Sequence, residues 1–229
     1  MTSTAQSVTT DKVPAPRQRP GLRERNKADK LRRIQRAARE LFVEKGYDNT
    51  TTREIAERAD VGLGTIFAYA ADKRDLLFLI FNSEIETVFK EGQRQAQQEP
   101  TLLRQLVAHF RSYYAFYAQQ PALSRFMLRE LMFYQTGKEA RRYQDGRKRL
   151  LRSLEELVAR AQAEGHLGRA EAPGVIAQAV FAIYAWEVRR CVSVDDPDVE
   201  AGLVRLHRML ALLVDGVDAP SAAPRDNGR

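Results

Sequence analysis

Long proline-free stretches restrict this chain to helical folds. No proline lies between Pro20 and Pro100 or between Pro121 and Pro173, so both stretches lack the residue that most strongly breaks an α-helix. Within them apolar residues recur every three or four positions, which is the spacing of one helix face. Strand-like alternation is nearly absent. The sequence therefore predicts an all-α protein of about nine helices.

Three short helices are predicted near the N-terminus. The first has an apolar stripe made of Leu31, Ile34, Ala38, Leu41 and Phe42. Gly46 follows this stripe, in the position where glycine commonly ends a helix. Thr51 and Glu54 have the spacing of a capping box and begin a second helix of about two turns. A third helix begins after Gly62.

Longer helices are predicted in the rest of the chain, near Asp72, Thr101, Pro121, Leu150, Pro173 and Asp196. The stretch from Pro121 to Tyr134 is apolar almost all round, so we expect it to be well buried. Asp196 is expected to cap the last helix, with Pro197 at its first position.

The link between the second and third helices has the length of the turn in a helix-turn-helix motif. Asp60 stands where that turn needs a positive φ, which Asp tolerates better than most residues. Val61 is expected to pack between the two helices. Gly62 suits a helix cap, and Gly64 falls in the first turn of the third helix, which enters the major groove in this motif. The two glycines therefore predict close approach to a DNA backbone.

Residues 30–77 resemble the DNA-binding domain of the TetR family of bacterial transcriptional regulators. The matching positions are Leu41-Phe42, Gly46-Tyr47, Thr50-Thr51, Ile55-Ala56, Ala59, Val61, Gly64-Thr65-Ile66-Phe67, Tyr69, Lys73 and Leu76-Leu77. Three positions depart from the usual pattern, because Asp60 replaces a glycine, Gly62 a serine cap and Ala70 an aromatic residue.

The resemblance implies a set of DNA contacts. Phosphates would be held by Thr51 or Thr52, Tyr69 and Lys73, and the groove would be faced by Arg53, Leu63, Gly64, Thr65 and Phe67. Side-chain chemistry agrees, because Arg53 can bond a guanine, while Leu63 and the methyl of Thr65 can contact a thymine methyl. The alternative for each residue is a solvated or core side chain.

Positive charge is concentrated at the N-terminus. Residues 1–39 hold eleven Lys or Arg and three Asp or Glu, whereas the whole chain of 229 residues has a net charge of +7. A basic end on a near-neutral body favours a polyanionic partner, and the alternative is a tail that only aids solubility. We expect a disordered basic arm (1–24), a helix-turn-helix domain (25–72), a helical ligand-binding and dimerisation domain (73–218) and a disordered tail (219–229).

The resemblance also implies that the second domain forms a homodimer and encloses a small-molecule pocket. The last helix carries a near-heptad seam of Leu203, Leu206, Leu210 and Leu213. This seam and the helix before it fit a four-helix interface across a two-fold axis, or the seam packs inside its own domain. A dimer would place two recognition helices about 34–36 Å apart, which predicts an inverted-repeat operator.

Aromatic residues dominate the candidate pocket and suit a lipophilic or aromatic effector. The candidates are Phe110, Tyr113, Tyr114, Tyr117, Phe126, Met127, Glu130, Phe133, Tyr134, Phe181, Tyr184 and Trp186. Core packing is the alternative for each of the apolar ones. For Glu130 the alternative is an internal ion pair with Arg125, Arg129 or another Arg.

These patterns predict a ligand-released repressor that binds double-stranded DNA. The alternatives are a nonspecific DNA-coating protein and an enzyme built in the helical domain, although no Walker loop, HExxH or GxSxG motif is present. We expect no cofactor and no metal, because the three histidines are dispersed and Cys191 is the only cysteine. No apolar run approaches the roughly 20 residues that span a bilayer, so we expect a cytoplasmic protein without a membrane partner.

Overall fold

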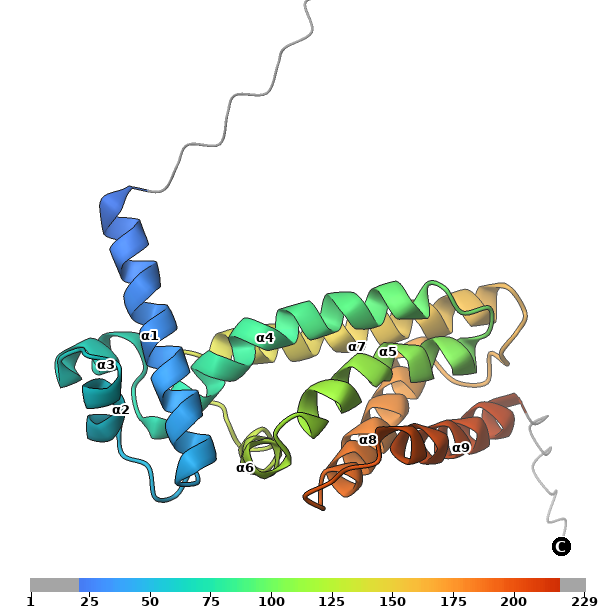
Figure 1. Cartoon of the computed structure of the whole chain (residues 1–229). Coiled ribbons are helices and arrows are strands. Elements are labelled where there is room, and N and C mark those ends of the chain that lie inside the picture. Colours follow the sequence, from blue (N-terminus) through green and yellow to red (C-terminus); the bar gives the residue numbers. More distant parts are fainter. Residues whose placement is uncertain (1–20, 219–229) are drawn as a thin grey trace, which may run out of the picture.

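The computed structural model describes residues 21–218, which form nine α-helices and no strand (Figure 1). The helices are α1 (Leu22–Glu44), α2 (Thr52–Arg58), α3 (Leu63–Tyr69), α4 (Lys73–Ala96), α5 (Leu102–Ala118), α6 (Pro121–Glu130), α7 (Ala140–Ala163), α8 (Pro173–Cys191) and α9 (Val199–Asp218). The all-α prediction is confirmed. Most of the predicted arm (1–20) and the predicted tail (219–229) lie outside the described residues. None of the described helices is long and apolar enough to cross a bilayer.

Helices α1 to α3 form a small bundle at one end of the molecule, and α4 leads from it into the larger helical body (Figure 1). Helix α1 begins at Leu22, so residues 22–24, predicted as part of the arm, are helical. Its first nine residues, 22–30, are exposed. From Ile34 onward it buries the predicted apolar stripe, with Ile34 and Ala38 fully buried, whereas Leu31 is half-buried.

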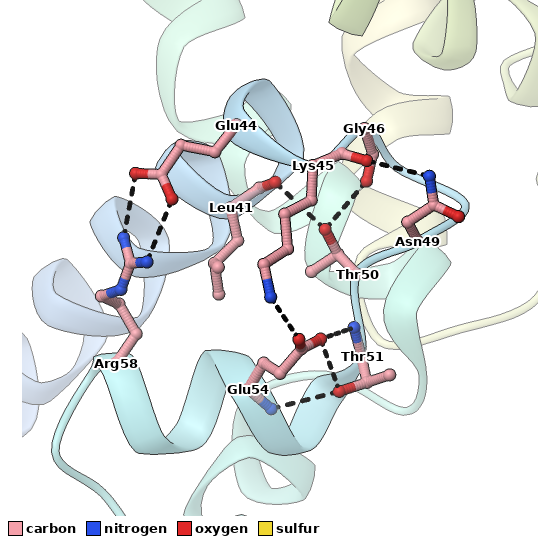
Figure 2. A network of polar contacts seen from close by, with 9 residues as sticks. All are labelled: Leu41, Glu44, Lys45, Gly46, Asn49, Thr50, Thr51, Glu54 and Arg58. Atoms are coloured by element: carbon pink, nitrogen blue, oxygen red, sulfur yellow. Dashed lines mark hydrogen bonds and ion pairs between the residues drawn. The ribbon is translucent and has the colours of Figure 1, made fainter.

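A polar network fixes α2 against the end of α1 (Figure 2). The Thr51 hydroxyl accepts from the Glu54 amide, and the Glu54 carboxylate accepts from the Thr51 amide at 2.8 Å, so the predicted capping box is confirmed. Lys45 Nζ lies 2.6 Å from the same carboxylate. Arg58 donates two parallel hydrogen bonds to Glu44, at 3.1 and 3.0 Å. The start and the end of α2 are therefore both tied to the last turn of α1.

The turn before α3 has the geometry that the sequence predicts. Asp60 has a φ of 50°, the only positive φ of a non-glycine residue among residues 21–218. Its carboxylate pairs with Arg33 at 3.1 Å, so α1 helps to hold this turn. Gly62 is the N-cap of α3 with an extended backbone. Ala70, which replaces an aromatic residue, is fully buried behind α3.

The larger body is built around α4, which lies along α7 and packs on α5, with α8 and α9 at the end away from α1–α3 (Figure 1). Backbones touch where α4 crosses α5. A Cβ at Gly92 would overlap the carbonyl oxygen of His109 and lie 2.9 Å from Ser112 Oγ. The Ser112 hydroxyl also donates to the Val88 carbonyl at 3.0 Å. This crossing is therefore fixed by backbone contact.

Helix α6 is shorter than the sequence predicts. It ends at Glu130, and Met132 and Phe133 are 61% and 76% exposed, so their predicted burial is wrong. Tyr134 is buried, because its ring stacks on Phe78 at 3.6 Å and its hydroxyl donates to Asp75. The chain therefore leaves the helix to bring Tyr134 to α4.

The start of α9 also differs from the prediction. The helix begins at Val199, and the Asp198 carboxylate accepts from the Ala201 amide at 2.9 Å. Asp198 therefore takes the capping role predicted for Asp196, and Pro197 lies outside the helix. A carboxylate caps best when it is three residues before a free amide.

His109 is a buried neutral histidine, and it makes stability depend on pH. Burial lowers its pKa to about 4, and neither ring nitrogen has a hydrogen-bond partner within residues 21–218. Because the unfolded chain binds a proton below about pH 6.5 and the folded chain does not, stability falls by roughly 1.4 kcal/mol per pH unit between pH 6.5 and 4. His109→Phe should remove this dependence in denaturant unfolding at pH 7 and 5. The exposed His207→Phe variant is the control and should keep it; equal slopes in both variants would contradict the assignment.

Candidate functional site

The outer side of α2 and α3 is open. Arg53 is exposed, and its side chain has no partner among residues 21–218. On α3, Gly64 and Phe67 are exposed, while Ile66 is fully buried against the bundle. The other predicted contact residues on this side, Thr52, Leu63 and Thr65, are half-buried. The structure therefore leaves the predicted groove-facing residues of α2 and α3 accessible.

Neither glycine at the start of α3 is required by the fold. A Cβ at Gly62 or Gly64 would meet no heavy atom of residues 21–218 within 4 Å. Gly62 has a φ of −67°, which any residue can adopt. In the first turn of α3, glycine costs up to about 1 kcal/mol relative to alanine. Packing among the described residues therefore does not require glycine at either position, and the first turn of α3 leaves room for a binding partner.

Two residues predicted to hold phosphates are already bonded within the bundle. The Tyr69 hydroxyl donates to the Lys27 carbonyl at 3.0 Å. Lys73 Nζ donates to the carbonyls of Tyr47 and Asp48, at 2.9 and 3.1 Å, and lies over the Tyr47 ring. Both residues therefore tie α3 and α4 to α1 and to the loop after it.

A cavity of about 310 Å³ lies between α4, α5, α6, α7 and α8. Four of the predicted pocket residues line it, namely Tyr113, Tyr117, Phe181 and Tyr184. Burial raises the pKa of the Tyr113, Tyr117 and Tyr184 hydroxyls, which therefore stay neutral. The cavity interior is aromatic and uncharged on this side.

The remaining predicted pocket residues do not line this cavity. They are Phe110, Tyr114, Phe126, Met127, Glu130, Phe133, Tyr134 and Trp186. Phe110 stacks on Tyr184 at 4.0 Å and fills the core beside the cavity, whereas Phe133 and Trp186 are exposed. Glu130 pairs with Arg129 at 3.1 Å, but the Arg129 side chain is 57% exposed, so this ion pair lies at the surface and is not internal.

Sequence reasoning did not assign any of the charged or amide residues of the cavity wall to the pocket. They come from α4, α7 and α8 and are Asn82, Glu86, Arg142, Arg147, Arg149 and Arg189. Arg149 pairs with Glu86 at 2.6 Å. Arg147 lies 5.9 Å from the centre of the Phe181 ring and has no carboxylate partner among residues 21–218. Arg142, Arg147 and Arg149 belong to the basic segment that precedes Leu150, but a basic segment alone does not show that it faces a cavity.

The charge on this wall is therefore positive. Besides Arg147 and Arg149, the wall includes Arg142 and also Arg189, which donates to the Leu128 carbonyl at 3.0 Å. An apolar interior with several guanidinium groups suits a ligand that combines an apolar body with an anionic group.

Comparison with known proteins gives a consistent result. Residues 34–80 match the family described as "Bacterial regulatory proteins, tetR family". The chain is 29% identical over 199 residues to the HTH-type transcriptional regulator HbdR of Aromatoleum sp. (strain CIB), covering 82% of this chain and 83% of HbdR.

Two solved structures share the fold. The Bacillus subtilis regulator FadR in complex with stearoyl-CoA has a TM-score of 0.64 and 20% identity, covering 81% of this chain and 98% of that one. The Thermus thermophilus FadR in complex with lauroyl-CoA, described as a repressor, has a TM-score of 0.63 and 24% identity, covering 86% and 100%.

Proposed function

This chain belongs to the TetR family of bacterial transcriptional regulators, and from that premise we propose that it binds an inverted-repeat operator as a homodimer and is released by a small effector. One observation carries the proposal: a single helix, α4, starts beside the open side of α3 and also forms a wall of the cavity. We place the boundary between the DNA-binding and effector-binding domains at Lys73, where α4 begins.

The DNA contacts that we propose centre on the open side of α2 and α3. Arg53 reads base edges, Leu63, Thr65 and Phe67 contact the groove floor, and Gly64 gives the backbone its clearance. Thr51, Thr52, Tyr69 and Lys73 lie around this side, and we propose that they add phosphate contacts, with Tyr69 and Lys73 also holding the bundle together.

The effector that we propose has an apolar body and an anionic group. The aromatic interior and the arginine-containing wall of the cavity support this chemistry. The ligands named for the two FadR structures, stearoyl-CoA and lauroyl-CoA, are of this kind.

A dimer interface on α8 and α9 is also part of the proposal. The predicted leucine seam does not supply its surface, because Leu203, Leu206 and Leu210 are at most 2% exposed within the protomer. Large apolar side chains are instead exposed on the two helices, namely Val175, Trp186, Val204, Met209 and Leu212. Such side chains favour an interface between copies of the chain.

Leu212→Glu should therefore convert the dimer to a monomer, because it buries a charge in an apolar interface. Sedimentation velocity measures the change. Val194→Glu is the matched control, since Val194 is exposed to a similar extent but lies between α8 and α9. A Leu212→Glu chain that sediments like the Val194→Glu chain would contradict this interface.

Selection of bound sequences from random DNA tests the proposed function. The full chain should select one inverted repeat and bind it far more tightly than scrambled DNA at physiological salt. Equal, strongly salt-dependent binding to all sequences would indicate the DNA-coating protein, and no binding at any salt would favour an enzyme.

A further inference from the structure

The loop between α6 and α7, residues 131–139, connects the cavity to α3. Lys138 Nζ donates to the carbonyls of Phe67 and Ala68, the latter at 3.0 Å. Helix α3 has no basic residue in its own last turn. A cation at a helix C-terminus satisfies the final carbonyls and interacts favourably with the helix dipole. Lys138 of the larger body therefore supports the end of the proposed recognition helix.

Asp75 holds this loop in place. The side chain is 1% exposed, and its carboxylate accepts from the amides of Lys138 at 3.0 Å and Glu139 at 2.9 Å. The same carboxylate accepts from the amide of Ala71 at 2.8 Å and from the Tyr134 hydroxyl. One buried group thus joins the loop to the segment that directly follows α3.

The next residue along the loop, Glu139, reaches the cavity wall. Asn82 Nδ2 donates to the Glu139 carbonyl at 3.1 Å and to its carboxylate at 2.9 Å. Arg142 lies 3.7 Å from the same carboxylate. Asn82 and Arg142 both line the cavity, and among the described residues the buried Asn82 side-chain oxygen has no hydrogen-bond partner. The anion-binding donors on this part of the wall are therefore occupied by a carboxylate of the chain itself.

We propose that the anionic group of the effector displaces Glu139 from Asn82 and Arg142, and that this displacement withdraws Lys138 from the end of α3. Lys138 and Glu139 are adjacent in the chain, so they move together. A ligand shifts an equilibrium only by its difference in affinity for the two states, and an anion binds these donors only in the state that Glu139 has left. Glu139 is thus a built-in competitor of the effector, and Lys138 is a positioning residue for DNA binding. This inference rests on the proposed function.

Operator binding without effector tests the Lys138 step. Lys138→Met should weaken binding to the selected operator about tenfold, within the usual range of coupling between sites. It should also speed hydrogen exchange of the amides of residues 66–70. Lys148→Met is the matched control, because Lys148 is exposed on α7 without a side-chain partner among the described residues, and it should behave as the unmodified chain. Unchanged affinity and exchange in Lys138→Met would overturn this step.

Dodecanoate and its uncharged methyl ester test the Glu139 step. Dodecanoate should bind Glu139→Gln several-fold more tightly than the unmodified chain, because the competing charge is gone, whereas methyl dodecanoate should bind both chains equally. Dodecanoate should release the operator from the unmodified chain and have a smaller effect on Lys138→Met. Failure of dodecanoate to bind, or equal affinity for both chains, would overturn the displacement.

These experiments distinguish a failure of the proposed function from a failure of the coupling through residues 131–139. A chain that selects no operator contradicts the proposed function. A chain that selects an operator and releases it, yet is indifferent to Lys138→Met and Glu139→Gln, contradicts only the coupling through residues 131–139.

Discussion

Gly64→Asp is expected to abolish operator binding without weakening the fold. A carboxylate in the first turn of α3 interacts favourably with the helix dipole, by about 0.3–1 kcal/mol, and its Cβ meets no atom of the described part of the chain within 4 Å. Against DNA, the same charge faces phosphates in the space that the glycine leaves open. We expect operator affinity to fall at least about 100-fold, which corresponds to roughly 2.7 kcal/mol. Fluorescence anisotropy at fixed salt and thermal melting measure the two effects.

The chain supplies a matched control for this variant. Thr101 is the exposed N-cap of α5, so a carboxylate there also stands at the start of a helix but outside α1–α3, α8 and α9. Thr101→Asp changes the net charge equally but far from α3, so it should bind the operator almost normally. Gly64→Ala should separate the loss of clearance from the added charge and bind with intermediate affinity. Tight binding by Gly64→Asp would show that α3 does not approach DNA by its first turn.

Asp75→Ala is expected to lower the free energy of unfolding by roughly 3–5 kcal/mol, because it leaves buried donors without an acceptor. Three backbone amides and the Tyr134 hydroxyl lose their partner. Denaturant unfolding measures the change. Asp72→Ala is the control, since it removes only the cap of α4 and should cost about 1 kcal/mol. A similar decrease in the free energy of unfolding in both variants would contradict the role of Asp75 as the shared acceptor of these hydrogen bonds.

The Asp75 carboxylate should also make the free energy of unfolding depend on pH under acidic conditions. Burial alone would raise the pKa of Asp75, but the hydrogen bonds from Tyr134, Ala71, Glu139 and Lys138 outweigh it and hold the pKa below its usual value. The stabilisation is therefore complete above the unfolded pKa of about 3.9 and is lost as pH falls through the lower folded value. Asp75→Asn should lack this acid-dependent loss in unfolding measurements below pH 4.

The sequence predicts the helix-turn-helix part well because its determinants are local. Thr51 with Glu54, Asp60 in the turn and Gly62 at the cap each act within a few residues, so spacing alone reveals them. The same holds for the long helices, because their periodic apolar residues form the buried face of each helix.

The cavity is harder to predict because periodicity marks a buried face without showing which part of it is filled. Phe110 and Tyr113 lie on the same side of α5, yet Phe110 packs on Tyr184 while Tyr113 borders empty space. The 131–139 loop was missed for another reason. Its shape depends on Asp75, about 60 residues earlier in the chain, and a local sequence pattern does not predict such a long-range contact.

The backbone contact at Gly92 determines how α4 can move. Because a Cβ at Gly92 would overlap the backbone of α5, we expect α4 to tilt about this crossing rather than slide along its neighbour. At 1.5 Å per residue, Asn82 lies about 15 Å from this pivot and Lys73 about 28 Å. If α4 tilts about Gly92, Lys73 therefore moves about twice as far as Asn82. A small displacement of α4 beside the effector would become a larger displacement beside α3.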